Sequence, residues 1–117
     1  MKRKNSLTRT IDIERVKRTG ISFANPLMAL IAAPNSLPFS RFAIAAGRSI
    51  GNAVKRNRAK RQLRSCLDAL FETINPGWDL IVYGRIRISS AKYYEIRLAM
   101  NDIMQEAGLF TPGVKID

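Results

Sequence analysis

Between residues 55 and 64 the sequence carries a run of basic side chains, its most conspicuous chemical feature. Six of these residues are Lys or Arg and none is acidic. Like charges on one helix repel one another, and near a helix start each cation is disfavoured by roughly 0.3–1 kcal/mol. An arginine guanidinium can, however, fork onto a phosphate group. The run therefore indicates a polyanionic partner, and its members are Lys55, Arg56, Arg58, Lys60, Arg61 and Arg64.

Two asparagines accompany these cations. Asn52 precedes the run and Asn57 stands within it, between Arg56 and Arg58. Amide side chains can donate and accept hydrogen bonds at sugar and base edges. On a helix, positions 52, 56 and 60 follow one side, and positions 57, 61 and 64 follow an adjacent side. The pattern predicts a ridge that could lie against a folded RNA.

The sequence offers little for catalysis by its own side chains. It has no histidine and one cysteine, Cys66, so the commonest general base is missing and neither an internal disulfide nor a zinc cluster can form. The segment from Gly47 to Gly51 lacks the spacing of a phosphate-cradling loop. Asp12 and Glu14 point to different faces of a helix. We expect no catalytic group and no metal site in this chain.

The net charge is both large and uneven. The chain has 117 residues and a formal net charge of +11. Residues 1–64 carry 15 Lys or Arg and two acids, a net charge of +13, whereas residues 65–117 carry five Lys or Arg and seven acids, a net charge of −2. This excess favours nucleic acid as the partner, with an acidic membrane surface as the second choice.

Length and hydropathy bound the organisation of the chain. We expect a single domain over residues 1–117, with residues 1–8 as a mobile basic arm. The sequence contains no run of about 20 apolar residues, so no membrane-spanning helix is predicted. No apolar signal core follows the basic start. Cytoplasmic residence is the simplest expectation.

Hydrophobic spacing predicts the elements that position these residues. Their order is helix, three strands, helix, strand and helix, which indicates an α+β fold with a small mixed sheet. Helices are predicted over residues 9–19, 52–73 and 91–107, and strands over residues 21–24, 27–33, 41–46 and 79–85.

The predicted helix over residues 52–73 has two unlike halves. Asn52 is suited to cap its start, and the turns that follow are basic. The second half has an apolar stripe with the spacing of a core-facing helix. We therefore expect the second half to pack on the core while the first half presents its charge. The stripe consists of Leu63, Cys66, Leu67, Leu70, Phe71 and Ile74.

The basic segment also carries a resemblance to a known family. Residues 48–64 read RSIGNAVKRNRAKRQLR and resemble the signature of the protein subunit of bacterial ribonuclease P. The segments around Leu7 to Gly20, Gly77 to Arg85 and Glu106 to Leu109 are similar to the family's first helix, last strand and closing helix. The resemblance implies an α-β-β-β-α-β-α two-layer sandwich with a left-handed crossover, similar to a domain of a ribosomal small-subunit protein.

The resemblance also implies a function. In this family the partner, ribonuclease P RNA, uses Mg²⁺ to remove the 5′ leader of precursor tRNA, and the protein binds that RNA through its basic helix. The protein thereby promotes catalysis without supplying a catalytic group, and neither DNA nor a membrane is a partner. The RNA-binding residues implied here are Arg48, Asn52, Lys55, Arg56, Asn57, Arg58, Lys60, Arg61 and Arg64.

The family holds the single-stranded leader in a cleft between its first helix and its sheet. The family usually has an aromatic at position 13 and often at positions 17 and 31, where this chain has Ile13, Lys17 and Ile31. An aromatic in such a groove contributes about 1–3 kcal/mol per stacked base. The substitutions imply weaker or more electrostatic leader binding. The leader-binding residues implied here are Arg9, Ile13, Lys17, Ile31 and Arg85.

Other aromatic residues are expected to be structural. Trp78 follows a Pro-Gly turn and is predicted to cover an edge of the core. Phe23, Phe39 and Tyr83 could line a groove, but core packing is the simpler interpretation for each of them.

Three other functions compete with this interpretation. A structural ribosomal protein would fit the composition and fold class but leave the Arg-Asn-Arg motif unexplained. A stand-alone nuclease needs a base or metal ligands, which the sequence does not offer. A DNA-binding protein is the weakest alternative, because the basic helix lacks a helix-turn-helix partner and a dimer seam.

Overall fold

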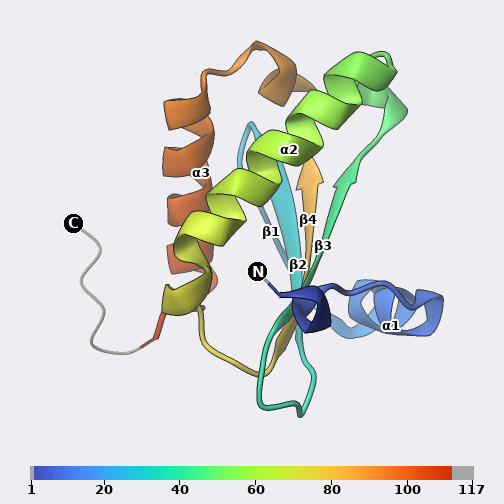
Figure 1. Cartoon of the computed structure of the whole chain (residues 1–117), viewed down its shortest axis with the longest axis vertical. Helices are drawn as coiled ribbons and strands as arrows, with labels where there is room; N and C mark the ends of the chain where they lie inside the picture. Colours follow the sequence, from blue (N-terminus) through green and yellow to red (C-terminus); the bar gives the residue numbers. More distant parts are fainter. Residues whose placement is uncertain (1, 112–117) are drawn as a thin grey trace.

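The computed structural model of the chain describes residues 2–111 and has the predicted order of elements (Figure 1). The α+β class is therefore confirmed. The helices are α1 (Thr10–Thr19), α2 (Ala53–Leu70) and α3 (Tyr93–Glu106), and the strands are β1 (Ile21–Ala24), β2 (Met28–Pro34), β3 (Arg41–Ala46) and β4 (Trp78–Gly84).

The four strands form one mixed sheet in the order β1-β2-β4-β3. The pairs β1–β2 and β2–β4 are antiparallel, whereas β3 and β4 are parallel. A parallel pair needs a long crossover connection, and α2 lies within it. Because β3 and β4 run in the same direction, Gly47 and Arg85, the residues that follow them, lie at the same end of the sheet.

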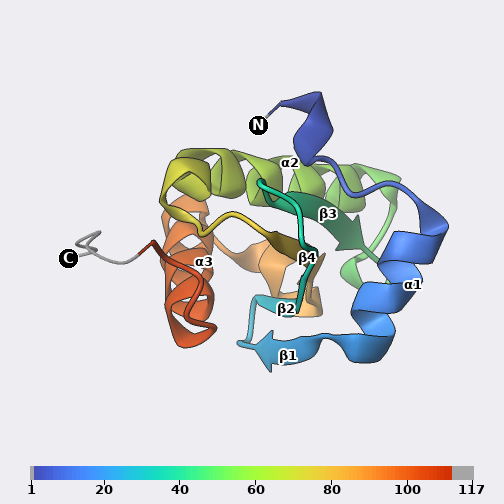
Figure 2. The same cartoon turned by 90° about the horizontal axis from the view of Figure 1, so that it is seen from below.

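The helices lie on both faces of this sheet (Figures 1 and 2). Helices α2 and α3 cover one face, where Leu67 and Met100 join a large core with Leu80. Helix α1 lies on the other face. Successive side chains of a strand point to opposite faces, so Ile81 belongs to a second core, here called the smaller cluster. The buried members of the smaller cluster are Leu7, Val16, Ala33 and Ile81.

Helix α1 covers only one end of its face. It lies beside the end of the sheet where β3 and β4 begin (Figure 1), and its Arg15 reaches Asp79 near the start of β4. Ala45 and Tyr83 pair with each other near the opposite end. No helix of residues 2–111 lies over that end on the α1 side (Figures 1 and 2).

Part of the segment 1–8, which is expected to be a mobile basic arm, is packed against the sheet. A short 3₁₀ helix, η1 (Arg3–Asn5), precedes α1. The buried Asn5 side chain donates to the Ser40 carbonyl at 2.8 Å, and the backbone N–H of the buried Leu7 donates to the Phe42 carbonyl at 2.8 Å. Residues 5–7 are therefore docked against the start of β3, because a buried amide and a buried leucine anchor them. Met1 lies outside the described residues.

Some element ends differ from the prediction. Helix α2 ends at Leu70, and the last predicted turn is a 3₁₀ helix, η3 (Phe71–Thr73). Two further 3₁₀ helices, η2 (Arg48–Ile50) and η4 (Ile86–Ser90), form in segments without a hydrophobic repeat. Gly20 follows α1 and has φ −76°, which any residue can adopt. The position requires glycine because an added Cβ would lie only 2.5 Å from the Val16 carbonyl oxygen.

Candidate RNA-binding surface

Local hydrogen bonds fix the start of α2. The Asn52 side-chain oxygen accepts the Lys55 backbone N–H at 3.0 Å, as an N-cap should. Arg56 is half-buried and donates from Nη1 to the Gly51 carbonyl at 3.3 Å. Gly51 has φ +137°, a conformation that a residue with a side chain adopts only under strain. The sequence therefore builds a defined helix start directly before the basic run.

The basic side chains of α2 point to solvent. Of the six cations between residues 55 and 64, only Arg56 is half-buried. Among the described residues, none of the six forms an ion pair. The helix is held to the core by other positions, chiefly Ala59, Leu63, Cys66 and Leu67, which are all buried. The predicted division of α2 into an anchored half and a charged half is confirmed.

The other predicted RNA-binding residues lie close to this surface. Asn57 is exposed on α2, beside the cations. Arg48 is exposed in η2, between the end of β3 and the start of α2. The structure thus places all nine predicted residues on one continuous segment, from Arg48 to Arg64. Asn52 and Arg56 also have roles within the protein: Asn52 is the predicted N-cap, whereas the hydrogen bond from Arg56 to Gly51 is not predicted from the sequence.

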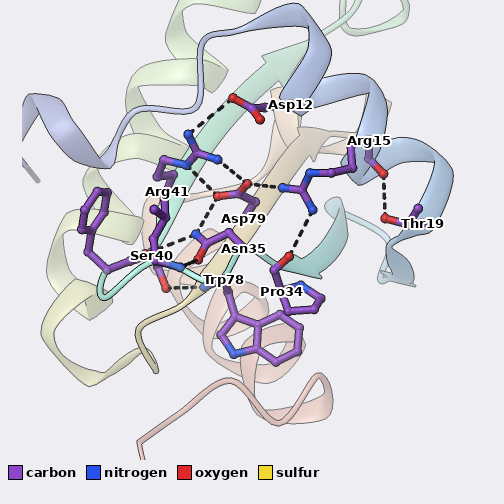
Figure 3. A network of polar contacts seen from close by, with 11 residues as sticks. Asp12, Arg15, Thr19, Pro34, Asn35, Ser40, Arg41, Trp78 and Asp79 are labelled. Atoms are coloured by element: carbon purple, nitrogen blue, oxygen red, sulfur yellow. Dashed lines mark hydrogen bonds and ion pairs between the residues drawn. The ribbon is translucent and has the colours of Figure 1, made fainter.

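A buried ionic network lies at the end of the sheet where β3 and β4 begin (Figure 3). The Asp79 side chain is fully buried and is bound by two arginines, Arg15 of α1 and Arg41 of β3. Arg41 donates from Nε at 2.9 Å and from Nη2 at 2.7 Å. Asn35 donates to the same carboxylate at 2.8 Å. Arg41 also pairs with Asp12 of α1 at 3.4 Å.

This network joins α1 to the sheet. Arg15 and Asp12 belong to α1, whereas Arg41 and Asp79 belong to neighbouring strands. Arg15 also donates to the Pro34 carbonyl at 3.1 Å. The hydrogen bond to Asp79 raises the pKa of Arg41, with further contributions from both carboxylates, so its charge is retained. The network therefore fixes where α1 lies on its face.

Sequence reasoning did not find this network. Arg41 and Asp79 are directly paired in the β3–β4 register, and both stand at the start of a predicted strand. Opposite charges at such positions are a usable signal only once the two strands are known to be parallel neighbours. That pairing depends on the crossover through α2, which local sequence patterns do not specify.

The structure brings together some of the predicted leader-binding residues and separates others. Ile13 of α1 and Ile31 of β2 are half-buried, and both pack against the smaller cluster. Lys17 is exposed, one turn along α1 from Ile13. Arg9 is exposed at the α1 start. Arg85 is exposed at the opposite end of the sheet, where it donates from Nη1 to the Asn25 carbonyl at 3.0 Å.

Tyr83 also belongs to this face of the sheet. It is half-buried and packs against the smaller cluster, as do Ile13, Ile31 and Ala43. Burial raises the pKa of its phenol above the ordinary value, so the ring is neutral under physiological conditions. Tyr83 is expected to be a core residue, but only part of its side chain is buried. Phe39 has a different contact: the Lys4 ammonium group lies over its ring, 5.0 Å from the ring centre.

The described residues offer no metal centre of their own. Over residues 2–111, no three Cys, Asp or Glu side chains come together as a ligand set. In the same part of the chain, no helix has the length and hydropathy to cross a lipid bilayer.

Comparisons with known proteins agree with this structure. The model of the Ribonuclease P family matches residues 1–108. The ribonuclease P protein component of Herpetosiphon aurantiacus is 34% identical over 110 residues, which cover 94% of this chain and 89% of that protein. The ribonuclease P protein component of Dehalococcoides mccartyi strain 195 is 32% identical, over 95% of this chain and 91% of that protein.

Solved structures share the fold. The RNase P protein of Staphylococcus aureus superposes with a TM-score of 0.84 at 24% identity, over 92% of this chain and 98% of that one. The RNase P protein of Thermotoga maritima gives a TM-score of 0.78 at 23% identity, over 86% of this chain and 96% of that one. The sequence match over almost the whole chain and the shared fold lead to one conclusion: this chain belongs to the ribonuclease P protein component family.

Proposed function

We propose that this chain is the protein subunit of a bacterial ribonuclease P, within the general role of its family in tRNA processing. In this proposal it binds the catalytic ribonuclease P RNA through α2 and promotes removal of the 5′ leader from precursor tRNA. The observation that carries the proposal is the charged first half of α2, whose exposed cations have no acidic partner among the described residues.

The proposed mechanism is electrostatic. Each Lys or Arg that neutralises a phosphate releases counterions and lowers the cost of bringing two polyanions together. The side chains from Lys55 to Arg64 stand on one rigid helix, so their spacing is fixed before the RNA arrives. Hydrolysis, in this proposal, is carried out by the RNA with the Mg²⁺ that it holds. The protein's part is to bind and to orient.

The proposal assigns precursor tRNA to the open face of the sheet. Helix α1 covers one end of that face, and Arg85 follows β4 at the other end. A single strand of RNA laid along this face would meet Lys17 and Arg9 on the α1 side. The exposure of these three cations supports the assignment. With RNA as its partner, the protein is proposed to act in the cytoplasm, without DNA or a membrane.

Cleavage of precursor tRNA at low Mg²⁺ tests this function. The reaction contains ribonuclease P RNA alone, with the wild-type protein, or with an Arg58→Ala/Arg61→Ala variant. Both arginines are exposed and form no ion pair with the part of the chain that the structure describes. The wild type is expected to restore cleavage and the variant to lose most of that effect. A Lys92→Ala/Arg97→Ala variant removes two exposed charges near α3 and is the matched control. Failure of the folded wild type to restore cleavage would refute the proposal.

A further inference from the structure

The open end of the sheet, on the face that α1 partly covers, has one large side chain flanked by two small ones. In the register, Tyr83 of β4 pairs with Ala29 on one side and with Ala45 on the other. All three residues are half-buried. Methyl groups cannot cover an aromatic ring, and no helix of residues 2–111 lies over this end of the face (Figures 1 and 2). Part of the Tyr83 ring is therefore available to a ligand.

The ring is held in place from within the protein. It packs against the smaller cluster together with Ile13, Ile31 and Ala43. Its hydroxyl group makes no hydrogen bond with any residue in the range 2–111, so the ring is positioned by packing and its polar end is unused. An aromatic side chain fixed in this way loses little entropy when a planar ligand stacks on it.

Three exposed cations belong to the elements that border the open part of this face. Arg48 follows the end of β3, and Arg85 follows the end of β4, where η2 and η4 are adjacent. Lys17 projects from α1, which bounds the open face at its other end. A fixed aromatic among cations is the arrangement that binds single-stranded nucleic acid, in which bases stack on the ring and phosphates meet the charges.

We infer that Tyr83 is a stacking platform for one base of the single-stranded 5′ leader. This inference rests on the proposed function and adds a residue to it. Ile13, Lys17 and Ile31 are not aromatic, and they imply weaker or more electrostatic leader binding. Tyr83, however, is the diagonal cross-strand neighbour of Ile31, because Ile31 pairs with Ile81, and such neighbours lie about 7–8 Å apart. Tyr83 would therefore give this site an aromatic contact from the strand next to Ile31.

Two substrates and two tyrosines provide the test. Holoenzyme is assembled from ribonuclease P RNA and wild-type, Tyr83→Leu, Tyr83→Phe or Tyr94→Leu protein. Leucine keeps the bulk of the side chain but cannot stack. Tyr94 is 60% exposed on α3, on the far face of the sheet, so Tyr94→Leu is the matched control. Binding is measured for precursor tRNA with a long single-stranded leader and for the same tRNA with its leader shortened to one nucleotide.

We expect Tyr83→Leu to weaken binding of the long-leader substrate by about 5- to 150-fold, the range that corresponds to one lost base stack. Binding of the short-leader substrate should not change, Tyr83→Phe should keep the preference for the long leader, and Tyr94→Leu should match the wild type. A long leader built from abasic nucleotides keeps the phosphates but offers no base. The wild type should bind it only as well as Tyr83→Leu binds the normal long leader.

The outcomes distinguish the stacking role of Tyr83 from the proposed function of the protein. If the wild type prefers the long leader and Tyr83→Leu shows the same preference, the stacking role is wrong while the proposed function stands. An equal loss on both substrates, or an abasic leader bound by the wild type as tightly as the normal one, also overturns the stacking role. A folded wild-type protein that does not support leader-dependent binding at all overturns the proposed function together with it.

Discussion

Asp79 shows how a single side chain organises this molecule. It is fully buried, and its carboxylate accepts hydrogen bonds from Arg15, Arg41 and Asn35 (Figure 3). Burial of a charge is costly unless the charge is paired and hydrogen-bonded. Three elements must therefore meet at this carboxylate, and α1 is one of them. The position of α1, and with it the width of the open face, depends on this residue.

Replacing Arg41 with methionine should destabilise the protein by about 3 kcal/mol. The change removes two hydrogen bonds to Asp79 and leaves a buried carboxylate short of one cation. The expected loss lies at the low end for a broken buried pair, because Arg15 and Asn35 remain. Urea unfolding of Arg41→Met and of the exposed control Arg97→Met measures the difference. Equal stability of the two variants would contradict the account.

The thiol of Cys66 should make stability depend on pH in the alkaline range. Burial raises the pKa of this thiol. Below the ordinary thiol pKa of about 8.5 both states are neutral, and at higher pH the unfolded chain ionises first. Stability from this group is therefore complete at neutral pH and is lost as pH rises through the raised pKa.

Urea unfolding of the wild type and of Cys66→Ala, compared at about pH 7 and about pH 10, isolates this effect, because the other groups cancel in the difference. The advantage of the wild type over Cys66→Ala should shrink at the higher pH. An advantage that stays constant, or that grows with pH, would show that the thiol is not buried as the structure describes.

At the scale of elements, α2 joins two roles in one helix. Its second half buries Leu63, Cys66 and Leu67, and its first half presents charge. The sequence predicts this division because the hydrophobic spacing begins where the basic run ends. It also predicts Asn52 as the cap, because short polar side chains satisfy the free N–H groups at a helix start.

Two substitutions at Asn52 should separate folding from RNA binding. Asn52→Ala removes the cap and should cost about 1 kcal/mol of stability. Asn52→Asp keeps a capping oxygen and places a negative charge at the helix start, which favours the helix but repels phosphate. We therefore expect Asn52→Asp to be at least as stable as the wild type yet to bind ribonuclease P RNA more weakly. Thermal unfolding and filter binding measure the two effects.

The helices and strands could be predicted from the sequence, but the contacts between them could not. All seven helices and strands follow from local periodicity, with end errors of a few residues. The 3₁₀ helices η2 and η4 do not, because three- to five-residue turns have no repeat to detect. The docking of Leu7 on Phe42 and the network at Asp79 depend on strand pairing over long sequence distances. Tyr83 was likewise expected in the core, since its sequence context does not reveal its two alanine neighbours.

At the scale of the whole molecule, the positive charge is concentrated in one part of the chain. Residues 1–64 carry a net charge of +13 and residues 65–117 a net charge of −2. The paired cations, Arg15 and Arg41, stabilise the fold, whereas the exposed cations of α2 have no ion pair within residues 2–111. A molecule built in this way should bind RNA with a strong dependence on salt.

That dependence can be measured for the wild type and for Arg58→Ala/Arg61→Ala. Each phosphate contact contributes about −0.7 to −0.9 to the slope of log K against log salt concentration. Removing two contacts should therefore make the slope shallower by about 1.4 to 1.8. An unchanged slope would mean that these two arginines do not face phosphates in the complex.

The most direct test of the central claim, that the first half of α2 faces ribonuclease P RNA, is tethered cleavage. In a Cys66→Ala background, Val54→Cys on α2 or Leu98→Cys on α3 carries an iron chelate that generates hydroxyl radicals; the two native side chains are 74% and 61% exposed. If the first half of α2 faces the RNA, we expect localised cuts in the RNA from position 54 and background cleavage from position 98. Background cleavage from position 54, with localised cuts from position 98, would contradict it.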